Sequence, residues 1–379
     1  MSCFGRARHI RAAPVLPALI LAACATSQVP EPSVPSTALV PSVAPRATLS
    51  PSATPALDPE DSAEGKIAYM RIHGNEYPGE VVVRELADGT ERVIVESGFP
   101  IAFTLDGSGL FVAEPIEEPQ ERLLLYPTDG GEPTELLDNV FIAFAPPSTS
   151  PDGRFVALAS DGAAPNGLVV LDLAAGTASQ LTTDGGQGRP RWSPDSRWLA
   201  YHAVSPGTGW TDLYMVDVTG DPPRRMTNDR ITDVPMGWTD NGASVIVARY
   251  ATIDPTSQTA LLDVVTGALT EAPELFDSST PARSPDGRWE LVVRTNASEL
   301  RPVGGSSSDG RVLPGTDDAE FTWSPDGAWL VWSGRADGSL HPPNLFMLRV
   351  PDGEVIRLTH TEAEEVMPVW GGATVRPGQ

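Results

Sequence analysis

Cysteine, lysine and histidine are the residues that this chain of 379 residues uses least. Its two cysteines are Cys3 and Cys24, and Lys66 is its single lysine. Cys3 falls in the segment that we interpret below as a removable leader, so the mature chain would keep one thiol and form no internal disulfide. Four histidines lie outside that leader, with no H-E-x-x-H or other paired spacing, and the sequence therefore predicts no metal site.

Positive charge is also scarce. The chain has 26 basic and 50 acidic residues, which gives a formal net charge of −24. Phosphate binding needs clustered Lys and Arg, so a nucleic-acid partner is excluded, and anionic lipid headgroups should repel this surface. The sequence shows no G-x-S-x-G nucleophile motif, and it predicts neither catalytic residues nor a cofactor.

The N-terminal segment 1–23 has the pattern of an export signal. A basic start is followed by an apolar run over residues 12–23, which is too short to span a bilayer. The run ends in Leu21-Ala22-Ala23-Cys24, which resembles the lipobox of bacterial lipoproteins. The resemblance implies that Cys24 is acylated and becomes the first residue of the mature chain. The alternative is an ordinary secretory leader with a chance cysteine.

Residues 24–62 should form a tether. Eight prolines lie between Pro30 and Pro59, mixed with Ser, Thr, Ala and Val, and apolar residues show no periodicity. Such a segment cannot bury enough surface to fold. Fully extended as polyproline II, it would reach on the order of 120 Å, at about 3.1 Å per residue. We expect it to hold the following domain away from the membrane.

A short turn motif recurs through the rest of the chain. The sequence S-P-D-G or S-P-D-S stands at four places, and T-L-D-G and T-D-N-G are degenerate copies. The turn aspartates counted in the six copies, 106, 152, 195, 240, 286 and 326, are separated by 46, 43, 45, 46 and 40 residues. A period near 40–45 with four short strands per unit is typical of a β-propeller blade. We assign structural roles in these turns to Asp152, Asp195, Asp286 and Asp326.

The strand pattern predicts seven blades in an all-β propeller over residues 63–372, followed by a tail at 373–379. Three strands, Lys66–Ile72, Glu80–Leu86 and Glu91–Glu96, precede the first turn motif, and six four-strand units follow. The strand Met367–Trp370 is left over. We expect it to complete the N-terminal blade, which closes the ring and removes its exposed edges. Six blades is the alternative, if one weak unit is irregular.

These repeats resemble the TolB-like, WD-like propeller family. The similarity lies in W-S-P-D after the inner strand and in D-L-Y-M-V-D with the following R-R-M-T-N. It implies a fold and leaves function open, because propellers host many unrelated activities.

The loops between blades, and those between the second and third strands of each blade, should surround one mouth of the central channel. They form an acidic rim with a few aromatic residues, which suits a cationic ligand, a peptide or a metal ion. Trp210 is the leading candidate, because a large apolar side chain in a Gly-rich loop has little packing role. The candidate binding face consists of Tyr77, Arg189, Trp210, Asp233, Asp277, Asp318, His341, Glu364 and Glu365.

We therefore expect a lipid-anchored extracytoplasmic protein of the bacterial cell envelope. Its propeller would act as a non-catalytic scaffold that binds an envelope protein or another extracytoplasmic ligand, and TolB-like propellers are best known from envelope protein assemblies. The alternative is an enzyme acting on carbohydrate or peptide, which would need two channel-face carboxylates roughly 5–9.5 Å apart. A third reading is a spacer without a ligand.

Overall fold

The computed structural model describes most of the chain from residue 63 to residue 372. The described ranges are 63–117, 120–140, 147–160, 167–183, 186–205, 209–251, 254–272, 282–292, 298–316, 320–335 and 342–372. The predicted leader, tether and tail, with Cys24, lie outside them. No helix in these ranges is long and apolar enough to cross a membrane.

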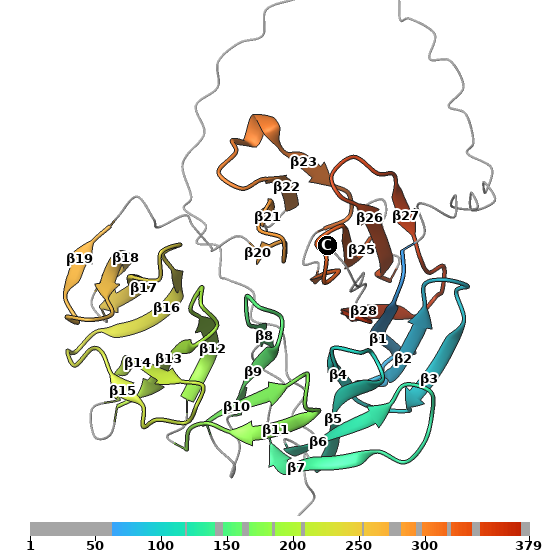
Figure 1. Cartoon of the computed structure of the whole chain (residues 1–379), viewed down its shortest axis with the longest axis horizontal. Coiled ribbons are helices and arrows are strands. Elements are labelled where there is room, and N and C mark those ends of the chain that lie inside the picture. Colours follow the sequence, from blue (N-terminus) through green and yellow to red (C-terminus); the bar gives the residue numbers. More distant parts are fainter. Residues whose placement is uncertain are drawn as a thin grey trace, which may run out of the picture. The chain divides into compact units, whose positions relative to one another are not determined.

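The strands form seven antiparallel sheets of four, arranged as the blades of a propeller (Figure 1). In each blade the strands succeed one another from the centre of the ring outward. Blade 1 consists of β28 (Glu364–Gly371), β1 (Lys66–Ile72), β2 (Glu80–Glu85) and β3 (Glu91–Val95). The C-terminal strand β28 thus pairs with β1, and the prediction of seven blades with one shared blade is confirmed.

The other six blades follow in chain order, each made of four consecutive strands. Blade 2 contains β4 (Phe99–Phe103), β5 (Gly109–Glu117), β6 (Gln120–Pro127) and β7 (Thr134–Val140). Blade 3 contains β8 (Ser148–Thr149), β9 (Phe155–Ser160), β10 (Gly167–Asp172) and β11 (Thr177–Gln180). Blade 4 contains β12 (Gly186–Trp192), β13 (Trp198–Val204), β14 (Thr211–Asp217) and β15 (Arg224–Arg225).

Blade 5 contains β16 (Thr232–Trp238), β17 (Ser244–Ala251), β18 (Asp254–Asp263) and β19 (Leu269–Glu271). Blade 6 contains β20 (Ala282–Arg283), β21 (Trp289–Val292), β22 (Ser298–Pro302) and β23 (Arg311–Leu313), with the 3-10 turn η2 (Ser307–Asp309) before its last strand. Blade 7 contains β24 (Phe321–Trp323), β25 (Trp329–Gly334), β26 (Asn344–Arg349) and β27 (Val355–Arg357).

The core lies between blades. The second and third strands are apolar on both faces, so each sheet packs against both of its neighbours. One cluster joins blades 3 and 4 around Trp192 and Tyr201, and another joins blades 6 and 7 around Trp332. Burying one such side chain contributes about 1.5–3 kcal/mol, so the inter-blade clusters hold the ring together. Among described residues, blades 5 and 6 are linked by the Arg283–Asp240 ion pair of 2.9 Å.

The recurring turn joins the first and second strands of a blade through side-chain hydrogen bonds. In blade 7, Ser324 Oγ donates to Asp326 Oδ1 at 2.6 Å and accepts from the backbone N–H of Trp329 at 2.9 Å. Asp326 Oδ1 also accepts from the N–H of Ala328 at 3.0 Å. The Gly at the fourth position has a positive φ of 69°, which a residue with a Cβ rarely adopts.

Two copies of the turn depart from this pattern. In blade 5 Asn241, one residue after the counted Asp240, accepts from Thr239 Oγ1 at 2.9 Å and from the N–H of Ala243 at 3.0 Å. In blade 4 Ser196 replaces the Gly and still adopts a positive φ of 59°. Its hydroxyl accepts from the N–H of Asp152 at 3.0 Å, so here the turn also binds the neighbouring blade.

Candidate functional site

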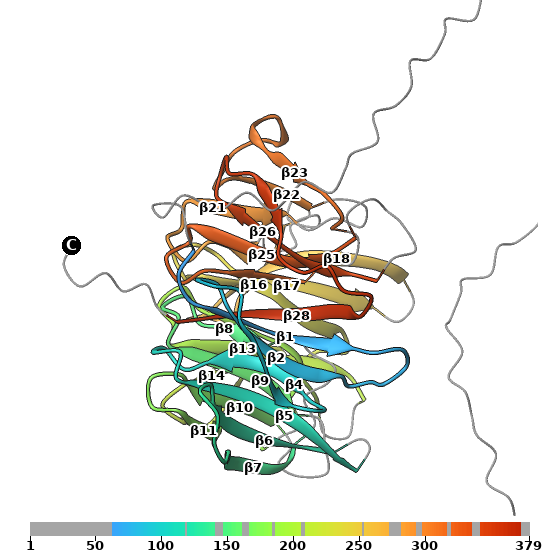
Figure 2. The same cartoon turned by 90° about the vertical axis from the view of Figure 1, so that its right-hand side faces the viewer.

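The two faces of the ring differ in what they expose. Because strands alternate in direction, the hairpins between second and third strands lie on the same face as the loops from one blade to the next. We call this the loop face, and the opposite one, which carries the S-P-D-G turns, the turn face. In Figure 2 the β1–β2 hairpin of the loop face, in blue, projects at the right.

Half of the exposed large apolar side chains in the described ranges lie on the loop face. The described ranges contain eight large hydrophobic residues that are exposed. Four of them stand at or beside a hairpin between second and third strands, in blades 1, 2, 4 and 5: Tyr77, Ile116, Val204 and Tyr250. Tyr77 is 65% exposed, and its ring packs edge-on against Phe99 with centroids 5.6 Å apart. Aromatic residues held in place at a surface are typical anchors of protein interfaces.

The predicted site residues occupy different depths of this face. Trp210 is half-buried, and its carbonyl accepts from the N–H of Ser205 at 2.8 Å. Glu364 is exposed at the start of β28. Asp233 and Glu365, expected on the open rim, are completely buried. Asp277, Asp318 and His341 fall outside the described residues, as does the side chain of Arg189.

In blade 1, next to its junction with blade 7, the guanidinium of Arg71 binds several acidic side chains. Arg71 on β1 donates from Nε to Glu365 Oε1 at 3.1 Å and from Nη2 to Glu91 Oε2 at 2.7 Å. Its Nη2 also donates to the hydroxyl of Tyr69 at 2.6 Å, and its Nη1 lies 3.4 Å from Glu80. Burial is the largest single influence on Glu91 and opposes its ionisation, but the hydrogen bonds from Arg71 and Arg84 and the charge of Arg71 together outweigh burial and lower the pKa of this carboxyl.

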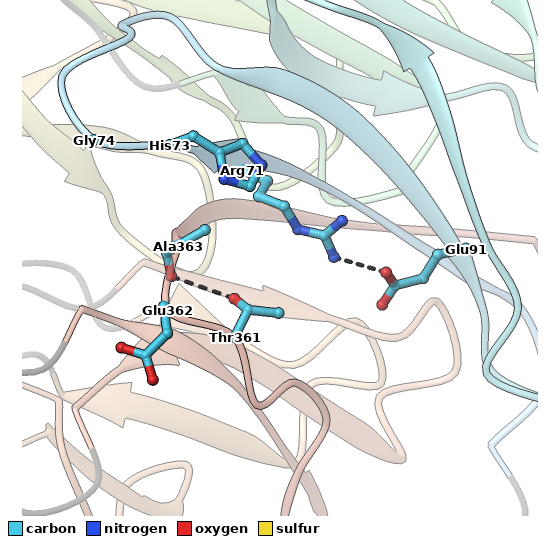
Figure 3. A pocket seen from close by; sticks show the side chains of 7 residues that line it. All are labelled: Arg71, His73, Gly74, Glu91, Thr361, Glu362 and Ala363. Atoms are coloured by element: carbon cyan, nitrogen blue, oxygen red, sulfur yellow. Dashed lines mark hydrogen bonds and ion pairs between the residues drawn. The ribbon is translucent and has the colours of Figure 1, made fainter.

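A cavity of about 320 Å³ opens beside this cluster (Figure 3). Arg71 and Glu91 lie on one side of it and Thr361 to Ala363 on another, with His73 and Gly74 from the β1–β2 hairpin. The cavity is within the size of small-ligand sites, and Tyr77 belongs to the same hairpin. Charged side chains that are fixed in place beside a cavity suit recognition of a polar partner.

At the junction of blades 4 and 5, three carboxylates meet. Asp212 at the start of β14, Asp229 in the loop before β16 and Asp233 on β16 each bring an oxygen within 4.8 Å of the others. Arg225 donates to Asp212, which also accepts from Ser205. Arg249 donates from Nε to Asp233 at 2.7 Å and from Nη2 to Asp229.

Two oxygens of this cluster are buried without a hydrogen-bond partner: Oδ1 of Asp212 and Oδ2 of Asp233. Each such atom costs about 1–3 kcal/mol when nothing satisfies it. Burial raises the pKa of Asp233, although the hydrogen bond from Arg249 opposes the rise. A raised pKa is useful in a general acid, but Asp233 has no exposed surface from which to reach a substrate.

The two junctions share one pattern of residue spacing and hydrogen bonds, which we call the junction frame. The spacing from Asp212 through Arg225 and Asp229 to Asp233 repeats from Asn344 through Arg357 and Thr361 to Glu365. Arg357 donates to Asn344 at 2.6 Å just as Arg225 donates to Asp212. Arg249 and Arg71 pair in the β-ladders with Asp233 and Glu365, respectively. Blade junction 4/5 therefore differs by two extra carboxylates, Asp212 and Asp229.

Sequence reasoning found part of this arrangement. It placed Asp233 and Glu365 in loops at the channel mouth, but it did not include Asp212 or Arg71. Both belong to apolar strand patterns, where a single charged residue looks like an outward-facing position. The repeated spacing from the third strand to the next inner strand was the signal that would have found them.

The comparisons with known proteins concern the fold alone. No protein-family model and no curated protein sequence matches the chain. Among solved structures, TolB from Acinetobacter baumannii is 17% identical with a TM-score of 0.42, covering 80% of this chain and 82% of that one. A functionally unknown protein from Desulfotomaculum acetoxidans is 13% identical (TM-score 0.47; 82% and 99% covered). An oligogalacturonate lyase in complex with manganese is 14% identical (TM-score 0.44; 78% and 85% covered).

Proposed function

We propose that this protein is an extracytoplasmic lipoprotein, anchored through Cys24, whose propeller binds an envelope partner with its loop face and performs no catalysis. The observation that carries the proposal is the distribution of exposed apolar side chains. Half of the large ones in the described ranges stand at loop-face hairpins of four different blades. Exposed hydrophobic groups set among charged ones mark interaction surfaces.

The charged groups of the same face support binding more than acid–base chemistry. Asp212, Asp233 and Glu365 are buried, and each accepts a hydrogen bond from an arginine. Carboxylates that are buried and bound by arginines in this way hold the loop face rigid and are not accessible to a substrate.

Site-directed photo-crosslinking in living cells tests the proposal. A photoreactive amino acid replaces Tyr77 or Ile116 on the loop face in separate variants. The control position is Val265 on the turn face, which is 83% exposed and therefore at least as accessible. We expect one discrete protein adduct of the same mass from both loop-face positions and none from position 265.

A second set of variants checks that the adduct reflects binding. The photoreactive residue stays at position 116, and Tyr77→Ala with Tyr250→Ala removes the two exposed rings. We expect the yield of the adduct to fall at least fivefold, while Val265→Ala leaves it unchanged. Equal adduct yields from both faces would contradict a specific partner of the loop face. The absence of an adduct at every position would contradict the existence of the partner.

A further inference from the structure

We propose that Asp212, Asp229 and Asp233 bind a divalent cation, for which Ca²⁺ is the best match, at the junction of blades 4 and 5. The geometry fits a single ion. Oxygens bound to one Ca²⁺ at about 2.3–2.6 Å lie at most about 4.6–5.2 Å apart, and the three carboxylates meet within 4.8 Å. All the donor atoms are hard oxygens, which is the ligand set that Ca²⁺ prefers.

The unpartnered oxygens point to a ligand independently of the acidic cluster itself. The side chains of Asp212 and Asp233 have no exposed surface, and each keeps one oxygen that no protein group satisfies. The arginines bind the other oxygen of each carboxylate. The structure thus leaves one buried carboxylate oxygen without a hydrogen-bond partner on each of Asp212 and Asp233, and both side chains belong to the cluster.

The cluster contains one more carboxylate than guanidinium groups. Three carboxylates share the two guanidinium groups of Arg225 and Arg249. Because like charges at this distance repel one another strongly out of water, a bound cation would supply the missing attraction.

Blade junction 7/1 shows that the junction frame does not require the extra carboxylates. Asn344 accepts the arginine hydrogen bond in place of Asp212, and Thr361 stands in place of Asp229. The backbone bonds around them are conserved between the junctions: the N–H groups of Leu213 and Leu345 each donate to a threonine hydroxyl at 2.9 Å. The hydrogen-bonded arrangement of such a junction therefore forms without acids at the positions of Asp212 and Asp229.

The cation has a route to the site. The side chain of Asp229 is 42% exposed, whereas those of Asp212 and Asp233 are buried. An ion would enter from the loop face, retain water on the side of Asp229 and bind the two buried oxygens on the other. A site with three carboxylates and retained water matches extracellular Ca²⁺ modules, with Kd values of about 0.1–1 mM.

The test is a titration of the full-length chain with CaCl₂ in 0.15 M NaCl. Isothermal calorimetry measures the stoichiometry and Kd, and thermal unfolding measures the shift in Tm. Salt at this concentration screens diffuse binding to the acidic surface. We expect one Ca²⁺ per chain, and a rise in Tm of about 2–3 °C at ten times Kd compared with EDTA. MgCl₂ at the same concentrations should give a smaller shift, because Mg²⁺ requires stricter octahedral geometry.

Variants that copy the neutral junction make the test decisive. Asp212→Asn and Asp229→Thr introduce the residue types found at the corresponding positions of junction 7/1, Asn344 and Thr361. Both variants should therefore fold. We expect each to lose the calcium-dependent rise in Tm, and Asp212→Asn to be at least as stable as the parent in EDTA because repulsion is relieved. Glu132→Gln, at an exposed acid of blade 2, should keep the full response.

Two results would overturn the proposal. One is a calcium response that is identical in the parent, in Asp212→Asn and in Glu132→Gln, which would mean diffuse binding to acidic surface. The other is no response in the parent at calcium concentrations up to 10 mM, which would mean that the three carboxylates bind no calcium ion.

Discussion

His202 illustrates how the ring treats a single ionisable side chain. It lies on β13, opposite Leu213 of β14, and its Nδ1 is buried without a hydrogen-bond partner. Burial lowers the pKa of His202 to about 4, because the imidazolium is poorly solvated there. The side chain is therefore neutral at physiological pH and serves as a packing residue.

The first prediction concerns the acid stability that follows from His202. The unfolded chain binds a proton near pH 6.5 and the folded chain only near pH 4, so the stabilisation is present above pH 6.5 and is lost as the pH falls toward 4. We expect the free energy of unfolding to drop by about 3 kcal/mol over that window from this group alone. Urea titrations of the parent and of His202→Gln at several pH values measure the difference, and equal slopes in both proteins would contradict it.

Burial is the main difference between the predicted and the observed positions of single acidic residues. The sequence predicted that Asp233 and Glu365 lie in loops between blades, but each is the second residue of an innermost strand, β16 or β28. That they are buried under arginines was not predictable, since pairing of Asp233 with Arg249 depends on the ladder register between β16 and β17. A one-residue shift would point either side chain to the other face of its sheet.

At the scale of the element, the S-P-D-G turn connects the first two strands of a blade and is stabilised by side-chain hydrogen bonds. Its serine is buried: Ser324 is 2% exposed, and its hydroxyl bridges Asp326 and the backbone of Trp329. Blades 2 and 5 use threonine in the same place. Thr104 Oγ1 accepts from the N–H of Gly109 at 2.9 Å, and Thr239 Oγ1 accepts from that of Ser244 at 3.0 Å.

The second prediction compares two substitutions at this turn. Ser324→Ala removes both hydrogen bonds and leaves a buried N–H unpaired, and we expect a loss of about 1–3 kcal/mol in unfolding free energy. Ser324→Thr keeps the hydroxyl and should cost less than about 0.5 kcal/mol, since two other blades use it naturally. Urea denaturation of the three proteins measures both values. Equal losses in the two variants would show that the hydroxyl is not the stabilising group.

The elements were the most predictable part of the molecule. The sequence placed β1 over Lys66–Ile72 as observed, and β2 and β3 to within one residue at their ends. Alternation, turn residues and a repeat near 45 residues are local signals, and each depends on neighbouring positions only. The turn of blade 5 was placed one residue early because Asn241 replaces the aspartate there and Asp240 precedes it.

At the scale of the whole molecule, attachment decides where the loop face can act. The propeller begins at residue 63, and the proposed lipid anchor at Cys24 lies 39 positions earlier in the chain. The tether predicted from the sequence would allow the loop face to meet partners at a distance from the membrane.

The third prediction tests this anchor. Cys24→Ala removes the thiol that would carry the lipid, so we expect the protein to move from the membrane fraction to the soluble extracytoplasmic fraction, or to accumulate as an unprocessed precursor. Cys3→Ala is the matched control and should leave the distribution unchanged. Fractionation with incorporation of a labelled fatty acid measures both. Retention of label by Cys24→Ala would show that Cys24 is not the site of lipidation.

The shared blade has a mechanical consequence. The first strand of the propeller along the chain, β1, lies between β28 and β2, with six residue pairs on each side. A force that pulls on the N-terminal end of β1 along its axis must shear two hydrogen-bonded ladders at once, whereas an outermost strand would peel from one. The N-terminal end of β1 is therefore a position that resists tension, as the proposed lipid anchor and loop-face partner would require.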